Sequence, residues 1–146
     1  MFDVFPSNII IELVDSTLNH PIQASEGAAG LDLFPRIGEP MTVKAGETVM
    51  IPTNVKIALP RGIAGLLIPR SSSGRGGLVL ANTIGLIDHD FRGEIMACLC
   101  PRETLSLDPH NRFVQLCLVS TPNTVFVMGK VNETVRGAGG FGSTGS

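Results

Sequence analysis

Apolar residues in this chain occur in short runs that are separated by glycine, proline and polar residues. Residues 55–59 and 113–119 combine alternating apolar positions with continuous apolar stretches, as expected for strands buried on one or both faces. No long segment shows the 3.6-residue apolar period of an amphipathic helix. The pattern therefore predicts a series of short β-strands with little helix.

The predicted strands are bounded by turn-forming residues, because 17 glycines and 10 prolines punctuate the sequence. The longest candidate is expected to break near Pro52, since proline cannot donate to a strand ladder. Many short strands joined by turns indicate an all-β fold of the sandwich or barrel type. The predicted strands are residues 9–13, 30–34, 48–59, 63–68, 78–80, 94–100, 112–119 and 124–131.

Length and composition indicate a single domain. At 146 residues the chain can bury a core without help from disulfides or metals. With 13 acidic and 11 basic side chains the net charge is −2, which disfavours nucleic acid as a partner. The three cysteines fit no zinc pattern and are expected to be buried thiols in a reducing compartment.

The N-terminal residues lack the features of a secretory signal, and no apolar run is long enough to cross a membrane. We therefore expect a soluble, intracellular protein with no membrane partner. Only 16% of the residues are charged and the mean hydropathy is positive, which is unusual for a lone domain. Some apolar surface is thus expected to be covered by other subunits.

Residues 69–77 (PRSSSGRGG) follow an apolar strand and combine groups that suit phosphate binding. Arg70 and Arg75 can form forked bonds to phosphate oxygens, and the serine hydroxyls can donate hydrogen bonds. The glycines let backbone N–H groups approach an anion closely. A solvated basic loop explains the same residues equally well.

Residues 82–94 (NTIGLIDHDFRGE) place three acids around a tight turn. With strand-like alternation, Asp88 and Asp90 share one face, which suits water activation or metal binding. His89 then points to the opposite face and is expected to contact solvent. The competing interpretation is a charged hairpin tip, since acidic residues are common in turns.

Residues 136–146 (RGAGGFGSTGS) are rich in glycine and have little to bury. Alone, this segment is expected to be a flexible tail. A single aromatic residue among glycines, after an arginine, also suggests a lid that closes over a ligand.

Five segments resemble, in order and in spacing, the five motifs of the trimeric all-β dUTP pyrophosphatase (dUTPase) family. Each segment is weak alone, but together they are specific and cover most of the chain. The segments are residues 29–33 (AGLDL), 69–72 (PRSS), 85–95 (GLIDHDFRGEI), 112–116 (RFVQL) and 136–145 (RGAGGFGSTG).

The resemblance implies a distorted jelly roll or β-barrel over residues 1–135, followed by a flexible C-terminal lid at residues 136–146. It also implies a homotrimer whose active sites each contain segments of more than one chain. The expected reaction is hydrolysis of dUTP to dUMP and pyrophosphate, which limits uracil in DNA and supplies dUMP for dTTP synthesis. The expected location is the cytoplasm or the nucleus.

By the same resemblance, Asp88 holds and deprotonates the water that attacks the α-phosphorus, and Mg²⁺ bridges the triphosphate. Asp32 is expected to support the site or to contact the waters of the metal. Phe141 is expected to stack on the uracil when the lid closes. The residues expected to bind substrate are Arg70, Ser71, Ser72, Asn82, Gly85, Ile87, Phe91, Gln115, Arg136, Phe141, Gly142, Ser143 and Thr144.

Phe91 departs from the family pattern, which usually has tyrosine at this position. The ring that packs against deoxyribose is kept, so discrimination against ribose is expected to persist through packing. Two alternatives stay open. One is a dCTP deaminase on a related fold, which would need a catalytic glutamate and a different third motif. The other is an interaction module that keeps the scaffold without turnover.

Overall fold

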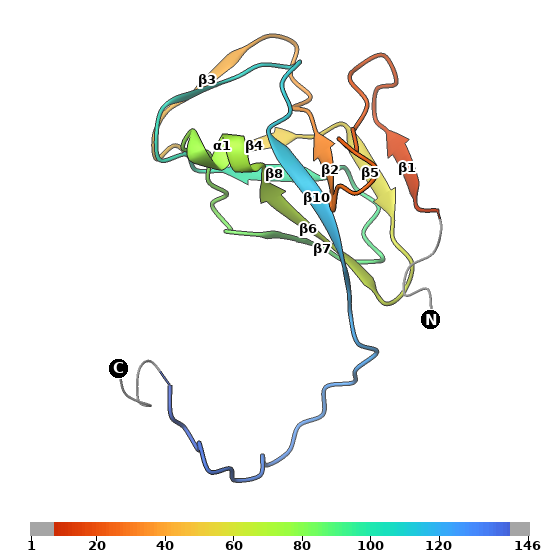
Figure 1. The fold of residues 1–146 in the computed structure, drawn as a ribbon, viewed down its shortest axis with the longest axis vertical. Coiled ribbons are helices and arrows are strands. Elements are labelled where there is room, and N and C mark those ends of the chain that lie inside the picture. Colours follow the sequence, from red (N-terminus) through yellow and green to blue (C-terminus); the bar gives the residue numbers. More distant parts are fainter. Residues whose placement is uncertain (1–7, 141–146) are drawn as a thin grey trace.

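The computed structural model describes residues 8–140, and nearly all of the regular structure in this range is β-strand (Figure 1). One short helix follows the sixth strand. The strands are β1 (Ile10–Leu13), β2 (Gly30–Leu33), β3 (Met41–Val43), β4 (Val49–Pro52), β5 (Val55–Ala58), β6 (Ile63–Pro69), β7 (Gly85–Ile87), β8 (Met96–Leu99), β9 (Leu105–Leu107) and β10 (Val114–Ser120), and the helix is α1 (Ser71–Arg75).

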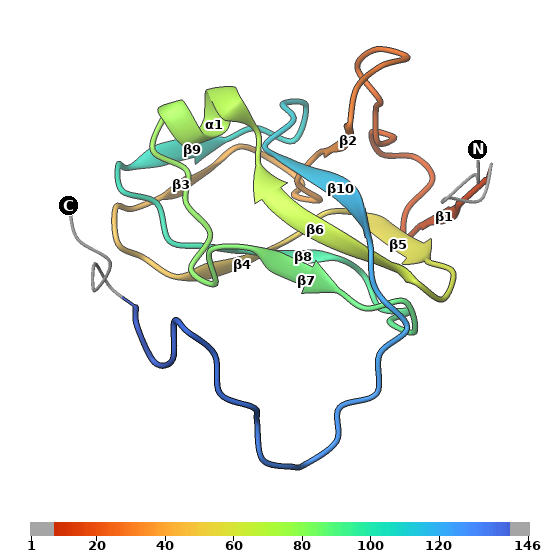
Figure 2. The ribbon, with the colours of Figure 1, turned by 60° about the horizontal axis from the view of Figure 1, so that its bottom comes forward.

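The largest sheet has four antiparallel strands in the order β2-β10-β6-β7. Three two-stranded ladders, β1-β5, β3-β9 and β4-β8, complete the body. In Figure 2, β6 and β10 lie across β4 and β8, and the apolar faces of these two layers enclose the core. The predicted all-β class is confirmed.

Burial in the core follows the two-residue alternation of the strands. In β8, Ala97 and Leu99 are fully buried, whereas Met96 faces outward. In β10, Val114 and Leu116 are buried in the same alternating way. Long antiparallel pairing along β10 therefore places one apolar face against the core and leaves polar side chains such as Gln115 near the surface.

Two predicted strands are wrong. Residues 78–80 form no strand, because Leu80 contributes only an isolated bridge to Leu99. Residues 124–131 have a strand-like apolar pattern, but in the described part of the chain no strand pairs with them. A strand needs a neighbour for its backbone donors and acceptors, so an apolar pattern alone does not form one.

Four elements were not predicted. Strands β3, β7 and β9 are each only three residues long, which is too short for a period to be visible. The stretch 69–77, expected to be a loop, contains α1. There the Gly74 N–H donates to the Arg70 carbonyl oxygen at 2.9 Å, and the Gly76 N–H donates to the Ser72 carbonyl oxygen at 3.0 Å.

The three cysteines are free thiols, and their side chains are only half-buried, which is less burial than the sequence predicted.

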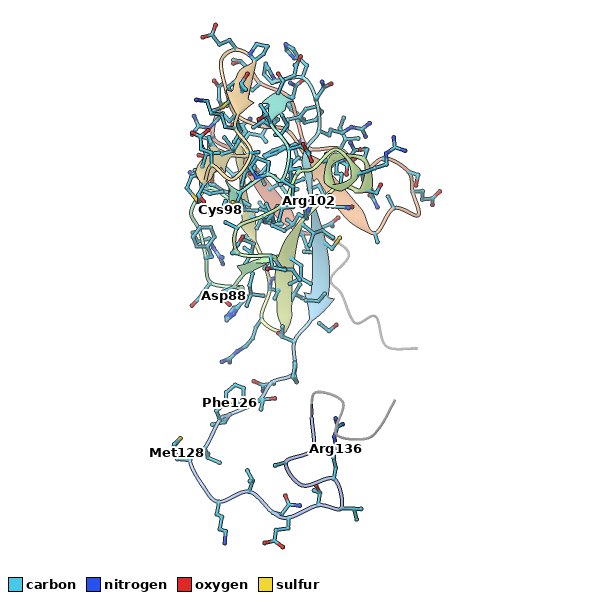
Figure 3. The ribbon with its side chains drawn as sticks, turned by 90° about the vertical axis from the view of Figure 1, so that its left-hand side faces the viewer. Asp88, Cys98, Arg102, Phe126, Met128 and Arg136 are labelled. Carbon is cyan, nitrogen blue, oxygen red and sulfur yellow. The ribbon has the colours of Figure 1, made fainter. Side chains whose placement is uncertain are left out.

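Residues 121–140, which we call the C-terminal arm, leave the end of β10 and run away from the body (Figures 1 and 2). The arm is exposed along most of its length, including its apolar residues. Phe126 is 96% exposed and Met128 is fully exposed, and Figure 3 shows both side chains far from the core.

Across residues 8–140, the structure contains no helix with the length and apolar composition that crossing a membrane requires.

Candidate active site

A buried aspartate organises one end of the four-stranded sheet. Asp32, on β2, is only 6% exposed, and its Oδ2 atom forms ion pairs with Arg70 Nε at 2.9 Å and Arg112 Nη1 at 3.0 Å. The strand register explains this meeting, because Gln115 of β10 pairs with Asp32 on one side and with Ile68 of β6 on the other. The residues that follow β6 and precede β10 therefore lie over β2.

The two arginines give this end of the sheet a surplus of positive charge, since one carboxylate faces two guanidiniums. Each guanidinium carries five N–H donors, of which Asp32 takes few. Arg70 and Arg112 are partly exposed, so the remaining donors can reach a ligand. We call Asp32, Arg70, Arg112 and Gln115 the arginine cluster. Its chemistry suits a phosphate group.

Three polar residues from the sequence prediction lie in or beside the arginine cluster. Ser71 and Ser72 begin α1, directly after Arg70, and both are exposed. Gln115 donates from Nε2 to the Pro69 carbonyl oxygen at 3.3 Å, across the β6–β10 ladder. The opposite side of Gln115 contacts β2 at Gly30, where an added Cβ would overlap Gln115 Oε1. The missing side chain at Gly30 thus makes room for Gln115.

A second group of predicted residues lines a cavity of about 220 Å³ beside β7. Its first wall is β7, which is preceded by a tight turn in which Thr83 has a φ of 64°. Its second wall is the chain that returns into β8. The lining residues are Asn82, Gly85, Leu86, Ile87, Asp88, Phe91, Glu94, Ile95 and Met96. We call this space the β7 cavity. Its lining includes the residues between 82 and 91 that were predicted for the base and the sugar, together with the predicted catalytic carboxylate, Asp88.

The tip that carries Asp88 is held by local contacts. The Phe91 N–H donates to the Asp88 carbonyl oxygen at 3.2 Å, and Arg92 Nη1 donates to the His89 oxygen at 2.7 Å. The Phe91 ring packs so closely on Gly93 that a Cβ there would lie 2.7 Å from the ring edge. Asp88 itself is exposed at the rim of the body (Figure 3). His89 lines a different cavity, as expected for a side chain on the opposite face.

We call residues 85–96, which run from β7 through the Asp88 tip to the start of β8, the hairpin. An ion pair closes its base. Arg36 Nε and Nη2 donate to the two carboxylate oxygens of Glu94 at 2.8 and 2.7 Å, and the Asn54 N–H donates to Glu94 Oε1 at 2.8 Å. The hydrogen-bonded Arg36 guanidinium holds the pKa of Glu94 below its ordinary value of 4.5, although partial burial of the carboxylate acts in the opposite direction. The sequence interpretation missed Arg36, because no local pattern links residues that are 58 positions apart.

Asp88 and the arginine cluster lie at different levels along β6. Ile87, which precedes Asp88, pairs with Gly65, whereas Arg70 follows the last residue of β6. Five residue steps of extended chain lead from Gly65 to Arg70, which is about 16 Å along the strand. Within one chain, the Asp88 carboxylate and the arginine cluster are therefore separated along this strand.

The remaining predicted residues belong to the C-terminal segment. Arg136 is exposed on the arm, donates from Nε to the Gly139 carbonyl oxygen at 2.9 Å, and lies far from the body in Figure 3. Phe141, Gly142, Ser143 and Thr144 lie outside the described residues.

The sequence prediction missed Arg112 of the arginine cluster, although this residue opens the fourth motif. A charged residue directly before an apolar strand was the signal that could have identified it.

Comparison with known proteins assigns the family. The family model described as dUTPase matches residues 17–145. The chain belongs to the dUTPase family.

Bacterial relatives of this dUTPase-family chain align with most of its length. A deoxyuridine 5'-triphosphate nucleotidohydrolase of Hahella chejuensis is 38% identical over 147 residues, which cover 94% of this chain and 97% of the relative. The protein of the same description from Paraburkholderia xenovorans is 42% identical over 130 residues, covering 86% and 88% of the two chains. The Legionella pneumophila (strain Paris) protein is 38% identical and covers 99% of both chains.

Solved structures show the same fold. A Staphylococcus bacteriophage 80alpha dUTPase with dUpNHpp has a TM-score of 0.78 at 22% identity, and the match covers 97% of this chain and all of the phage chain. A variant of that phage enzyme has a TM-score of 0.80, covering 94% and 98% of the two chains. The dUTPase-family fold is thus kept despite low identity.

Substitution of Gly30 by alanine tests the placement of Gln115. The added Cβ displaces the flexible end of Gln115, not the backbone, so Gly30→Ala should fold but lose the Gln115 contact with Pro69. We expect the KM for a nucleoside triphosphate to rise by about tenfold, a free-energy change equivalent to about one lost hydrogen bond. Gly38→Ala, where a Cβ meets nothing within 4 Å, is the matched control. Equal KM values for the two variants would contradict the assignment.

The lowered pKa of Glu94 predicts a stability change with pH. Because the folded-state pKa lies below the unfolded value of 4.5, ionised Glu94 stabilises the fold above that pH, and this contribution is lost as pH falls through the folded pKa. At pH 7, Glu94→Gln should lower the free energy of unfolding by about 1–2 kcal/mol.

This difference should shrink below pH 4.5 in denaturant titrations at one protein concentration. Glu12→Gln removes the exposed ion pair with Lys56 and serves as the control, with little effect at any pH. A Glu94→Gln difference that stays constant down to pH 3 would show that the charge of Glu94 is not responsible.

Proposed function

We propose that this protein hydrolyses dUTP to dUMP and pyrophosphate. The observation that carries the proposal is the β7 cavity, which joins a base-sized space to an exposed carboxylate, Asp88. Relatives described as deoxyuridine 5'-triphosphate nucleotidohydrolases align with nearly the whole chain, which supports the same substrate. Such an enzyme limits uracil in DNA and supplies dUMP for dTTP synthesis. Because its substrate is a DNA precursor, we place it in the cytoplasm or the nucleus.

The β7 cavity would bind the nucleoside. Asn82 and the backbone of Gly85 and Ile87 line it and offer donors and acceptors to a uracil edge. A close fit of uracil against these groups would exclude the 5-methyl group of thymine, and the cytosine amino group would leave buried polar atoms unpaired. The Phe91 ring, 41% exposed at the rim, would pack against the deoxyribose.

Asp88 would act as the general base. Its carboxylate accepts a proton from a water as the water oxygen bonds to the α-phosphorus, and the bond from that phosphorus to the bridging oxygen breaks. The leaving group is pyrophosphate, and the product that keeps the new oxygen is dUMP. The exposure of Asp88 leaves room for both a water and a phosphate.

The arginine cluster would bind the triphosphate. Arg70 and Arg112 provide charge, while Ser71, Ser72 and Gln115 provide donors beside them. Among the described residues, no group of three His, Cys, Asp or Glu side chains could hold a metal. The residues therefore fit Mg²⁺ that is carried by the phosphates and keeps its waters, one of which Asp32 could contact. When bound, the ion would neutralise charge on the triphosphate.

A homotrimer would unite the partial sites. One chain separates Asp88 from Arg70 along β6, so a neighbour must supply the phosphate ligands for the β7 cavity. The exposed apolar residues of the C-terminal arm supply a reason to associate, because burying them against another subunit is favourable. Nucleic acid and membrane play no part in this proposal.

The end of the chain would close the site. We assign residues 1–135 to the β domain together with the first part of the C-terminal arm, and residues 136–146 to a lid in which Arg136, Ser143 and Thr144 contact phosphate. Phe141 and Gly142 would cover the uracil, with the Phe141 ring stacked on the base. The extended path of the arm away from its own body supports delivery of this lid to another subunit (Figure 3).

Replacement of Asp88 by asparagine tests the reaction. Asp88→Asn keeps the size of the side chain but cannot accept the proton, so kcat for dUTP should fall by at least about a hundredfold with a similar KM. Release of pyrophosphate from dUTP, UTP, dTTP and dCTP with and without Mg²⁺ measures activity and selectivity together.

The control is His89→Asn, which alters the neighbouring residue outside the β7 cavity and should leave kcat unchanged. Full activity of Asp88→Asn would reject the base assignment. Ammonia release from dCTP would favour a deaminase, and lack of any turnover by the unaltered protein would favour a binding module.

A further inference from the structure

Glu94 belongs to two environments at once. Its side chain lines the β7 cavity, and its carboxylate points to Arg36 behind the cavity wall. The side chain of Glu94 is 15% exposed and that of Arg36 is 36% exposed, so the pair is partly shielded from water. Arg36 does not line the cavity itself. The ion pair therefore connects the inner wall of the cavity with the body of the protein.

The hairpin has few other attachments. Its outgoing strand, β7, is paired to β6 as far as Ile87. Beyond that point, the hydrogen bonds of the tip in the described structure join residues 88–92 to one another. The returning chain meets the body at Glu94 and Ile95, where Ile95 exchanges backbone hydrogen bonds with Thr53 and Val55, and the ladder between β8 and β4 begins at the next residue, Met96. The second wall of the cavity is thus fixed from Ile95 onward, and Glu94 is its last side-chain attachment on the side of the tip.

A buried asparagine makes the anchor rigid. Asn54 is 1% exposed and adopts a φ of 68°, with its N–H bound to Glu94. The Asn54 side chain accepts from the Asp15 N–H at 2.8 Å and donates to the Asp15 carbonyl oxygen at 2.9 Å. Arg36 holds the other side of the carboxylate with a planar fork that fixes both direction and distance. The Glu94 carboxylate is therefore held by two partners, the Arg36 guanidinium and the Asn54 N–H.

We propose that Arg36 and Glu94 are a positioning pair that sets the width of the β7 cavity and thereby its discrimination between uracil and thymine nucleotides. The inference rests on the proposed function, because it assumes that the cavity receives the base. The two nucleotides differ by one methyl group, and a pocket rejects an extra methyl only if its walls cannot move apart. Without the fork, the part of the second wall that precedes Ile95 loses the side-chain contact that holds it at its distance from β7.

The experiment compares binding of dUMP and dTMP to Arg36→Gln, Arg36→Lys and the unaltered full-length protein by calorimetry, with dUTP hydrolysis measured in parallel. Arg36→Gln should weaken dUMP binding and reduce the dUMP-to-dTMP affinity ratio by about tenfold. Arg36→Lys, which keeps the charge without the planar fork, should give a smaller reduction. Lys44→Gln, which removes an exposed cation outside the β7 cavity, should leave the ratio unchanged.

The affinity ratio separates positioning from general destabilisation, because a smaller folded fraction lowers both affinities equally. An unchanged ratio in both Arg36 variants would overturn the inference, and if Arg36→Gln does not fold, Arg36→Lys decides alone. A changed ratio in a protein that does not hydrolyse dUTP would support the positioning pair while rejecting the proposed reaction. Failure of the unaltered protein to bind dUMP would overturn both.

Discussion

The antiparallel register of β10 between β2 and β6 is the constraint on which the rest of the site depends. It places Asp32 and Ile68 on either side of Gln115, so the chain that leaves β6 and the chain that enters β10 converge over β2. The same β6 strand pairs through its central residues with β7. A single shift of this register would turn core residues outward and separate the arginines from Asp32. Fold and phosphate chemistry are therefore specified by the same hydrogen bonds.

Two arginines share the buried carboxylate of Asp32. An isolated buried carboxylate is costly, and one guanidinium is enough to neutralise it. With Arg70 and Arg112 both in place, the carboxylate is paired and one positive charge remains for a ligand. At the hairpin, Glu94 is likewise held by Arg36 and a backbone N–H. In both places a carboxylate is held by basic and backbone groups, whereas Asp88 is exposed.

The sequence predicted the features that depend on local pattern. The longer strands, the β class and the motif residues around Asp88 and Arg70 follow from alternation, turns and resemblance. Residues 124–131 were misjudged because their apolar alternation indicates a strand, but pairing depends on a neighbour that the sequence does not reveal. Likewise, α1 is too short to show a helical period. The Arg36–Glu94 pair joins distant segments through side chains, and only the folded structure brings them together.

The central claim is that each chain carries two partial sites and that neighbours complete each other. Mixed assembly of two inactive variants tests it most directly. Asp88→Asn and Arg70→Gln, in which Arg112 still pairs with Asp32, would each be inactive alone. Unfolded and refolded together in equal amounts, they should regain dUTP hydrolysis at about a quarter of the sites, where an intact Asp88 meets an intact Arg70 of another chain. No recovery above the separately refolded variants would contradict the shared site.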